Sequence, residues 1–115
     1  MPSMTGFEFG DVVLVSFPFT DQVGSKQRPA VIINSKAYSQ DKSDFILMPI
    51  TSQIRAKTAF GEVIIENWKI AGLLKASVIK PVIFTVEKNL IRKVLGRLFE
   101  DDSQRLRQTL AMIIG

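Results

Sequence analysis

Two apolar, β-rich runs separated by a polar segment constrain the fold of this 115-residue chain more than any other feature. The runs are Val12–Phe17 and Ala30–Ile33, and the segment between them ends in Gly24-Ser25-Lys26-Gln27-Arg28-Pro29. Runs rich in valine, isoleucine and phenylalanine, bounded by glycine and proline, predict strands. The polar segment concentrates a glycine, a hydroxyl, an amide and two cations between these strands. That combination suits a phosphate or an RNA backbone better than it suits a core.

Further apolar runs with turn signals between them predict a strand-rich chain of the kind that forms a small barrel. The predicted strands cover residues 10–17, 29–34, 45–51 and 61–66, with an extended stretch over 76–85 that Pro81 interrupts. Pro29 is expected to begin the second strand, because the first residue of a strand can do without an N–H donor. Residues 35–43 are predicted to be a polar connection.

The second half of the chain carries helix signals. Asn67–Gly72 is expected to make one helical turn that ends at Gly72. Residues 86–99 fit a helix by their apolar spacing, and they also fit a strand that ends near Phe99. The acidic segment Glu100–Ser103 supplies caps and negative charge for a final helix. The apolar face of that helix would be formed by Leu106, Leu110, Ile113 and Ile114. The expected fold is mainly β with a C-terminal helix, in one domain over residues 1–115.

Two absent residue types exclude several kinds of chemistry. The chain has no cysteine, which excludes a disulfide, a thiol nucleophile and a thiolate metal site. It has no histidine, which removes the usual proton carrier near neutral pH and the commonest metal ligand. No apolar run approaches the ~20 residues that a membrane span needs, and the first residues do not resemble a signal peptide. We therefore expect a cytoplasmic protein that uses no metal and no cofactor.

The net charge of +4 is concentrated in one stretch of the sequence. Within residues 24–57 there are six cations and two acids, whereas the rest of the chain has nine of each. The cations of this stretch are Lys26, Arg28, Lys36, Lys42, Arg55 and Lys57. A polyanion is expected to be attracted to the surface that this stretch forms, although ordinary solvated charge gives the same pattern.

Two polar strand ends carry the candidate functional residues. The planar guanidinium of Arg28 can hold a phosphate through two hydrogen bonds while it remains charged. Thr51 ends a strand that is expected to neighbour the strand beginning near Arg28. Taken singly, Arg28 also fits an exposed arginine, and Thr51 fits an ordinary turn. Together they favour a binding site, for which the other candidates are Ser25, Lys26, Gln27, Ser52, Gln53 and Arg55.

The remaining aromatic and acidic candidates are assigned structural roles. Phe60 and Trp68 are expected to pack against other residues, and Glu62 and Glu66 are expected to be solubilising acids on an exposed strand face. No spacing in the sequence indicates a metal site or a nucleotide-binding glycine loop.

Five motifs, in order and spread over nearly the whole chain, point to a known family. They are Gly10-Asp11-Val12-Val13, Gly24-Ser25-Lys26-Gln27-Arg28-Pro29-Ala30-Val31-Ile32, Pro49-Ile50-Thr51-Ser52-Gln53, Gly72-Leu73-Leu74-Lys75-Ala76-Ser77-Val78-Ile79-Lys80 and Leu95-Gly96-Arg97-Leu98. Together these motifs resemble the MazF/PemK toxins of bacterial type II toxin–antitoxin systems. The loop before Arg28 is shorter than in many members of that family, and a family glutamine near Val82 is absent.

The resemblance implies an SH3-like (CcdB/MazF-like) small barrel that forms a homodimer. It also implies a sequence-specific endoribonuclease, or mRNA interferase, that cuts single-stranded mRNA to 2′,3′-cyclic phosphate and 5′-hydroxyl ends. Matched by motif, Arg28 and Thr51 would be the catalytic pair, with Ser25 in the substrate loop. The implied partner is a cognate antitoxin whose acidic, flexible C-terminal segment occupies the RNA groove, and the toxin–antitoxin complex would bind DNA.

Two other functions on the same fold remain open at this level. One is a CcdB-like gyrase inhibitor, although such relatives end in Trp-Gly-Ile whereas this chain ends in Ile113-Ile114-Gly115. The other is a non-catalytic RNA-binding module. For the nuclease, an RNA that supplies its own 2′-hydroxyl as nucleophile requires the protein to align that group and stabilise the phosphate. The group that removes the 2′-hydroxyl proton is not identified, because the pKa of arginine, above ~12, makes it a poor base.

Overall fold

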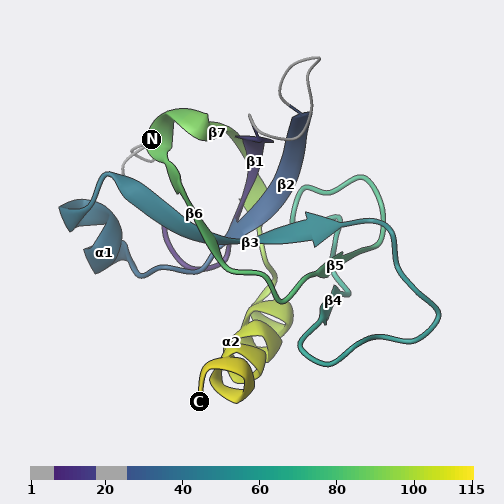
Figure 1. Ribbon diagram of the computed structural model, residues 1–115. Coiled ribbons are helices and arrows are strands. Elements are labelled where there is room, and N and C mark those ends of the chain that lie inside the picture. Colours follow the sequence, from purple (N-terminus) through teal and green to yellow (C-terminus); the bar gives the residue numbers. More distant parts are fainter. Residues whose placement is uncertain (1–6, 18–25) are drawn as a thin grey trace.

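Seven strands and a long C-terminal helix make up most of the computed structural model, which describes residues 7–17 and 26–115 (Figure 1). The strands are β1 (Asp11–Phe17), β2 (Lys26–Ile32), β3 (Asp44–Thr51), β4 (Val63–Ile65), β5 (Ser77–Ile79), β6 (Phe84–Glu87) and β7 (Ile91–Arg97). The helices are α1 (Lys36–Asp41), a 3-10 turn over Lys88–Leu90, and α2 (Glu100–Ile114). None of the helices in these described ranges is long and apolar enough to cross a membrane.

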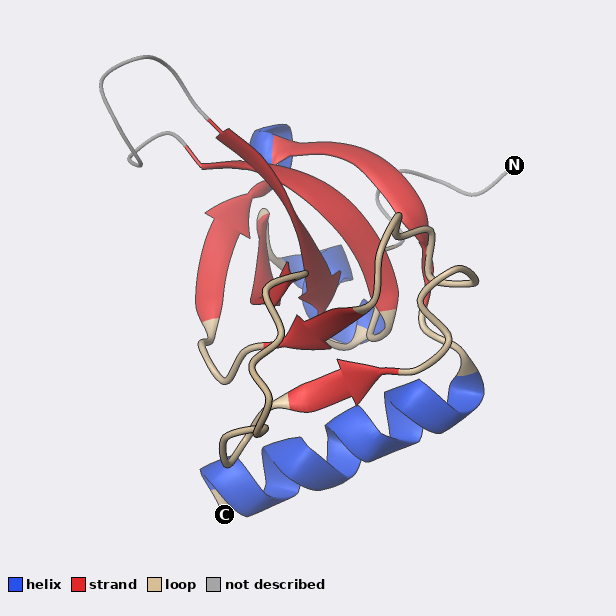
Figure 2. Ribbon diagram, turned by 90° about the vertical axis from the view of Figure 1, so that its right-hand side faces the viewer, coloured by secondary structure: helices blue, strands red, loops and turns tan. Residues whose placement is uncertain are grey.

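The strands form one antiparallel sheet that curls around the core (Figure 2). Their order is β4-β5-β3-β2-β1-β7, and β6 pairs with the first half of β3. Two register shifts in the pairing of β1 with β7 mark bulges, which increase the bend of a sheet. This architecture confirms the expected mainly β fold with a C-terminal helix.

The central strands contribute to two apolar clusters, one on each face of the sheet. Val12 of β1 packs in a cluster with residues of β4, β5 and α2, whereas its neighbour Val13 packs in a second cluster with Phe45 and Ile91. Successive residues of a strand point to opposite faces, so a strand that is buried on both faces carries a continuous apolar run. This explains why Val12–Phe17 shows no polar alternation in the sequence.

Most of the predicted elements are confirmed, and several boundaries move. The strands predicted over 10–17 and 45–51 correspond to β1 and β3, and the one over 61–66 shrinks to β4. The extended stretch over 76–85 divides into β5 and β6 on either side of Pro81. Of the two alternatives for residues 86–99, the strand is confirmed, because Ile91–Arg97 forms β7 and pairs with β1 along most of its length.

The polar stretch over residues 35–43 contains a short helix, α1, that the sequence analysis did not predict. The hydroxyl of Ser35 caps this helix by accepting a hydrogen bond from the N–H of Tyr38 at 3.2 Å. The buried Asn34 donates to the Ser39 hydroxyl at 2.6 Å, and that hydroxyl donates to the Phe7 carbonyl oxygen at 2.8 Å. A six-residue helix is too short to be stable alone, so these tertiary hydrogen bonds maintain it.

The prediction that Pro29 begins the second strand was also wrong. β2 begins three residues earlier, at Lys26, and the whole strand except its last residue pairs with β1. On its other side β2 pairs with β3 only over Ala30–Ile32. The half of β2 from Lys26 to Pro29 therefore forms an open edge, where a proline is tolerated.

The turn before β5 ends as the sequence predicts. The N–H of Leu73 donates to the Trp68 carbonyl oxygen at 3.0 Å, and that of Gly72 donates to the Lys69 carbonyl oxygen at 3.0 Å. This pair of bonds is the Schellman arrangement, which places a glycine at positive φ. Gly72 has φ +83°, and its backbone lies directly against Leu95 and Gly96 of β7.

The N-terminus of α2 is held by a buried carboxylate rather than by a capping side chain. The cap residue is Phe99, not one of the predicted caps over Glu100–Ser103, because the Leu98 N–H still bonds to the Gly10 carbonyl oxygen and keeps the chain extended up to that point. Asp102 in the first turn is fully buried. It accepts the N–H groups of Glu66 and Asn67 at 3.2 and 2.9 Å and pairs with Arg105.

We expect Asp102→Ala to lower the free energy of unfolding by about 2–4 kcal/mol, because it leaves two backbone donors without their acceptor and removes the buried partner of Arg105, which keeps its contacts with the Ile64 carbonyl oxygen and Glu66. Urea unfolding followed by circular dichroism measures this loss. Asp101→Ala is the matched control, since this exposed neighbour carries the same charge in the same helical turn and should cost at most about 1 kcal/mol. Equal losses for the two variants would contradict the assigned role of Asp102.

Candidate functional site

Arg28 and Thr51 lie where two neighbouring strands separate. β2 and β3 pair in the register Ala30↔Pro49, and two further steps of the same register would place Arg28 opposite Thr51. The pairing ends at Ala30, however, and β3 pairs instead with β5 through Ile50 and Thr51. The gap left between the two strands opens as cavities that both Arg28 and Thr51 line. The prediction that their strands are neighbours is confirmed.

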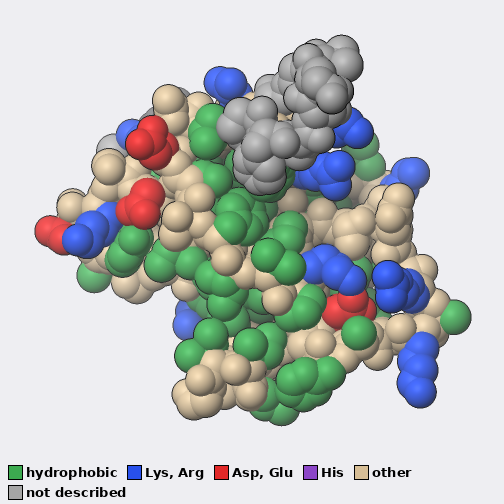
Figure 3. All heavy atoms as spheres, viewed as in Figure 1, with side chains coloured by type: hydrophobic (Ala, Val, Ile, Leu, Met, Phe, Trp, Pro, Cys, Tyr) green, Lys and Arg blue, Asp and Glu red, His purple; other side chains and the backbone are tan. Residues whose placement is uncertain are grey.

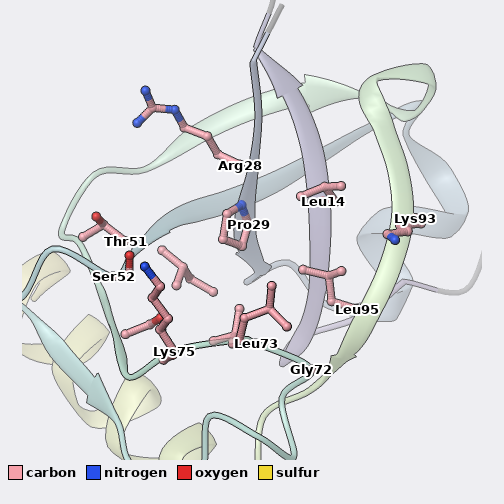
Figure 4. Close-up of a pocket in the computed structure, with 13 residues that line it drawn as sticks. Leu14, Arg28, Pro29, Thr51, Ser52, Gly72, Leu73, Lys75, Lys93 and Leu95 are labelled. Atoms are coloured by element: carbon pink, nitrogen blue, oxygen red, sulfur yellow. The ribbon is translucent and has the colours of Figure 1, made fainter.

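The first cavity has a volume of about 490 Å³ and lies on the side of β1 and β7 (Figure 4). Leu14, Pro29, Leu73 and Leu95 give it an apolar lining. Polar and cationic groups stand around this lining, with Arg28 on one side and Thr51, Ser52 and Lys75 on another, as Figure 4 shows. Apolar walls with a few polar groups are typical of ligand sites of this size.

The second cavity, also about 490 Å³, lies on the other side of the same two residues and is more polar. Besides Arg28 and Thr51, it is lined by Gln53, Ile54, Arg55, Lys80 and Val82, together with Pro49 and Ile50. Among the described residues, three cations and no acid contribute to this lining, so the cavity suits an anion.

The polar groups of Arg28 and Thr51 are available to a ligand. In the described part of the chain, no carboxylate forms an ion pair with the exposed Arg28 guanidinium. The Thr51 Oγ1 accepts a hydrogen bond from the N–H of Gln53 at 3.1 Å. Because the oxygen is the acceptor in that bond, the hydroxyl hydrogen is free to donate. The pair can therefore offer a phosphate a forked cation and a neutral donor.

Glu62 and Lys80 form an ion pair beside the second cavity. The Lys80 Nζ donates to the Glu62 carboxylate, which also accepts the N–H of Ala59 at 3.0 Å. The hydrogen bond from Lys80 is the main cause that lowers the pKa of Glu62 below its ordinary value, with the Ala59 N–H and the charge of Arg55 acting in the same direction. Glu62 is therefore ionised at neutral pH.

Of the other predicted site residues, some line the cavities and others do not. Ser52 lines the first cavity, and Gln53 and Arg55 line the second. Lys26 and Gln27 are exposed on the open edge of β2 and line neither cavity. Ser25 lies outside the described residues.

The basic stretch predicted over residues 24–57 does not form one surface. Lys36 and Lys42 lie on and beside α1, where acidic side chains accompany them, whereas Lys and Arg side chains gather on the opposite side of the molecule (Figure 3). On that second side three lysines from later in the chain line the cavities, namely Lys75, Lys80 and Lys93. Sequence reasoning missed these three because only the fold places β5 beside β3 and β7 beside β1, around the cavities.

Two structural assignments also need correction. Phe60, which was expected to pack, is 75% exposed, and Glu62, which was expected to be exposed, has a side chain that is only 7% exposed. Trp68 packs against the core as predicted. Within residues 7–17 and 26–115, no cluster of three or more acidic side chains is close enough to hold a metal ion.

Comparisons with known proteins identify a family from the sequence and a shared fold from the structure. The sequence profile of the family described as "PemK-like, MazF-like toxin of type II toxin-antitoxin system" matches residues 8–114. The chain is similar to the structure of MazE-MazF from Deinococcus radiodurans, with 23% identity, a TM-score of 0.75, and 96% and 97% of the two chains covered. It is also similar to an endoribonuclease in complex with its cognate antitoxin from a mycobacterial species, with 17% identity and a TM-score of 0.72 over 96% and 94% of the chains.

A third similar structure is the Mycobacterium tuberculosis toxin MazF-mt6, with 17% identity and a TM-score of 0.73 over 90% of this chain and 95% of the other. At these identities the structures show a shared fold. A search of curated proteins found no match.

Proposed function

Because the chain belongs to the PemK-like, MazF-like toxins of type II toxin–antitoxin systems, we propose that it is an mRNA interferase that cuts single-stranded mRNA within short sequences. The structures similar to this chain include endoribonucleases from mycobacterial species. The proposed cleavage needs no metal ion and leaves a 2′,3′-cyclic phosphate and a 5′-hydroxyl. The observation that supports it best is the position of Arg28 and Thr51 on the border of both cavities.

The proposed reaction uses a nucleophile that the RNA itself carries. The 2′-oxygen forms a bond to the adjacent phosphorus and loses its proton, while the bond from phosphorus to the 5′-oxygen breaks and that oxygen gains a proton. The phosphate keeps its net charge in the cyclic product, but negative charge gathers on its oxygens in the transition state. A protein that orients the phosphate and neutralises this charge accelerates the step without forming a covalent intermediate.

Arg28 and Thr51 are assigned complementary roles in this step. The Arg28 guanidinium would hold two phosphate oxygens through its fork and neutralise the charge that gathers on them. The Thr51 hydroxyl, whose oxygen is oriented by the Gln53 N–H, would donate to a phosphate oxygen and align the phosphorus with the 2′-hydroxyl. Arginine donates protons and does not accept them at neutral pH, so the proton acceptor is assigned to a group other than Arg28.

The neighbouring polar residues are proposed to bind the rest of the RNA. Ser52 would contact it in the first cavity, and Gln53 and Arg55 in the second. Lys26 and Gln27 at the start of β2 are proposed substrate contacts, as is Ser25, which precedes them in the sequence. The proposal includes no cofactor.

We further propose that the toxin acts as one domain in a cytoplasmic homodimer and is inhibited by a cognate antitoxin. The similar structures include a MazE-MazF complex and an endoribonuclease with its cognate antitoxin. An acidic, flexible segment of the antitoxin would compete with RNA for the cations beside Arg28, which suits a second cavity whose described lining residues include no acid.

We expect the purified protein to cleave single-stranded RNA in the presence of EDTA and to leave cyclic-phosphate ends. The reason is that both the nucleophile and the charge stabilisation are available without a metal ion. Sequencing the cut ends, together with a test for 5′-hydroxyls by kinase labelling, measures the outcome and the cleavage sequence. RNA in which the 2′-hydroxyls are replaced by hydrogen is the control and should stay intact. Cleavage of that control, or cleavage that EDTA abolishes, would contradict the proposed chemistry.

A further inference from the structure

Lys80 occupies a fixed position beside the residues assigned to catalysis. Its backbone N–H donates to the Pro49 carbonyl oxygen at 2.9 Å, which ties it to β3 two residues before Thr51. Its side chain lines the second cavity together with Arg28, Thr51 and Arg55. The backbone position of Lys80 is therefore coupled to that of Thr51.

Glu62 fixes the direction of the Lys80 side chain. The side chain of Glu62 is almost wholly buried, and its carboxylate accepts hydrogen bonds from both the Lys80 ammonium and the N–H of Ala59. The backbone N–H of Glu62 donates in turn to the Ala59 carbonyl oxygen at 3.1 Å. Because Glu62 is held at both its carboxylate and its backbone, it forms a rigid anchor for Lys80.

The Lys80 ammonium has more donors than Glu62 uses. An ammonium carries three N–H groups, and in the described part of the chain Glu62 is its one partner. The side chain is still 33% exposed, on the wall of a cavity that no acidic residue of the ranges 7–17 and 26–115 lines. The remaining donors are thus available to an anion in the cavity that Arg28 and Thr51 border.

We propose that Lys80, oriented by Glu62, binds the RNA phosphate next to the one held by Arg28 and Thr51. This inference rests on the proposed function, since it takes RNA as the ligand of the cavity. Glu62 is a positioning residue in this arrangement, because it acts on RNA only through Lys80. The pair determines which phosphate enters the second cavity and so fixes the register of the strand on the catalytic residues.

The salt dependence of RNA binding tests the role of Lys80. A 2′-deoxy heptamer, which cannot be cleaved by the proposed reaction, is titrated with each variant at several salt concentrations, and binding is followed by fluorescence anisotropy. Lys80→Met should weaken binding by about tenfold at low salt and reduce the slope of log K against log salt by about 0.7, the value for one phosphate on a single strand. Lys80→Arg should restore the slope, because arginine supplies the same charge.

Lys42→Met is the matched control, since Lys42 is also an ion-paired lysine but directly follows α1 and lines neither cavity. Its slope should equal that of the wild type. If Lys80→Met leaves both affinity and slope unchanged in a protein with wild-type circular dichroism, the inference is overturned. The same holds if that variant loses affinity for polyglutamate and none for the heptamer, which would assign Lys80 to an acidic partner.

The change in RNA affinity caused by Glu62→Gln tests the role of Glu62, because a counter-charge and a positioning residue predict changes of opposite sign. Glu62→Gln raises the net charge of the protein by one. If the Glu62 carboxylate acts only as a counter-charge that repels RNA, its removal should strengthen RNA binding. If Glu62 positions Lys80, Glu62→Gln instead weakens binding, and it has no further effect when Lys80 is already methionine. Stronger binding by Glu62→Gln would overturn the positioning role.

The inference and the proposed function fail in different ways. If the wild type binds the heptamer with a Lys80-dependent slope but does not cleave RNA, the nuclease proposal fails and the phosphate site stands. If the wild type cleaves RNA and the Lys80 variant binds with unchanged slope, the nuclease proposal stands and the phosphate site fails.

Discussion

Arg28→Ala is expected to lower kcat for RNA cleavage by about 10²- to 10³-fold, the usual effect of removing one preorganised donor from a developing negative charge. The structure supports this size of effect, because no described carboxylate neutralises the guanidinium and it lines both cavities. Arg28→Lys should recover only part of the rate, since an ammonium keeps the charge but lacks the planar fork. Single-turnover cleavage of a labelled RNA measures these rates.

Thr51→Val should lower kcat by about 10²-fold for the same reason. Valine keeps the branched shape that suits the end of β3, so the variant removes the hydroxyl with little change in packing. The matched control for both substitutions is Arg92→Ala, because Arg92 is an exposed arginine on β7 that lines neither cavity. Wild-type rates for both Arg28→Ala and Thr51→Val would remove the two residues from the catalytic site.

The largest loss of stability is expected where two glycines meet. A Cβ on Gly96 would lie 2.6 Å from the carbonyl carbon and oxygen of Ala71, and a Cβ on Gly72 would collide with the carbonyl of Leu95. Both neighbours are backbone atoms, so no side-chain rotation relieves the clash. Gly72 also has φ +83°, which costs an L-residue about 1–2 kcal/mol. This contact holds the segment that carries Leu73 and Lys75 against β7.

We therefore expect Gly72→Ala to lower the free energy of unfolding by about 3–5 kcal/mol and Gly96→Ala by about 2–3 kcal/mol. Urea unfolding measures both losses. Gly10→Ala is the matched control for Gly72, because Gly10 has φ +97° but its nearest neighbours, at 3.6 Å and beyond, are side-chain atoms. The free energy of unfolding of Gly10→Ala should fall by only about 1–2 kcal/mol, the cost of placing an L-residue at positive φ. A loss at Gly72 no larger than at Gly10 would mean that the close approach to β7 contributes nothing.

Gly72→Ala and Gly96→Ala should lower RNA affinity as well as stability, because the contact between these two glycines also shapes the first cavity. Leu73 and Lys75 form one wall of that cavity, and Lys93 and Leu95 of β7 lie across from them (Figure 4). A variant that remains folded at low temperature yet separates these walls is expected to bind the 2′-deoxy heptamer less tightly than the wild type.

Local patterns in the sequence were sufficient for most of the framework. The apolar runs of β1 and β3 and the turn that ends at Gly72 were predicted, because each depends on burial or on backbone preferences within a few neighbouring residues. The short motifs around Arg28 and Thr51 also led to the two residues that the structure brings to the same cavities. Their catalytic role stays a prediction until the variants are measured.

Errors arose where distant segments decide the local structure. α1 depends on hydrogen bonds that link Asn34 and Ser39 to Phe7. The early start of β2 depends on pairing with β1, and the burial of Glu62 depends on Lys80, which comes 18 residues later. A prediction that uses only neighbouring residues cannot identify any of these partners.

The sequence by itself determined the strand-rich class, the C-terminal helix, the family and the two residues most suited to a phosphate. Only the tertiary structure decided how those residues meet a ligand. β3 leaves β2 to pair with β5, and this change of partner opens the space that Arg28 and Thr51 line. The cations around that space include Lys75, Lys80 and Lys93, whereas Lys36 and Lys42 lie elsewhere. The physical reason is that strand pairing, not distance along the chain, sets which charges share a surface.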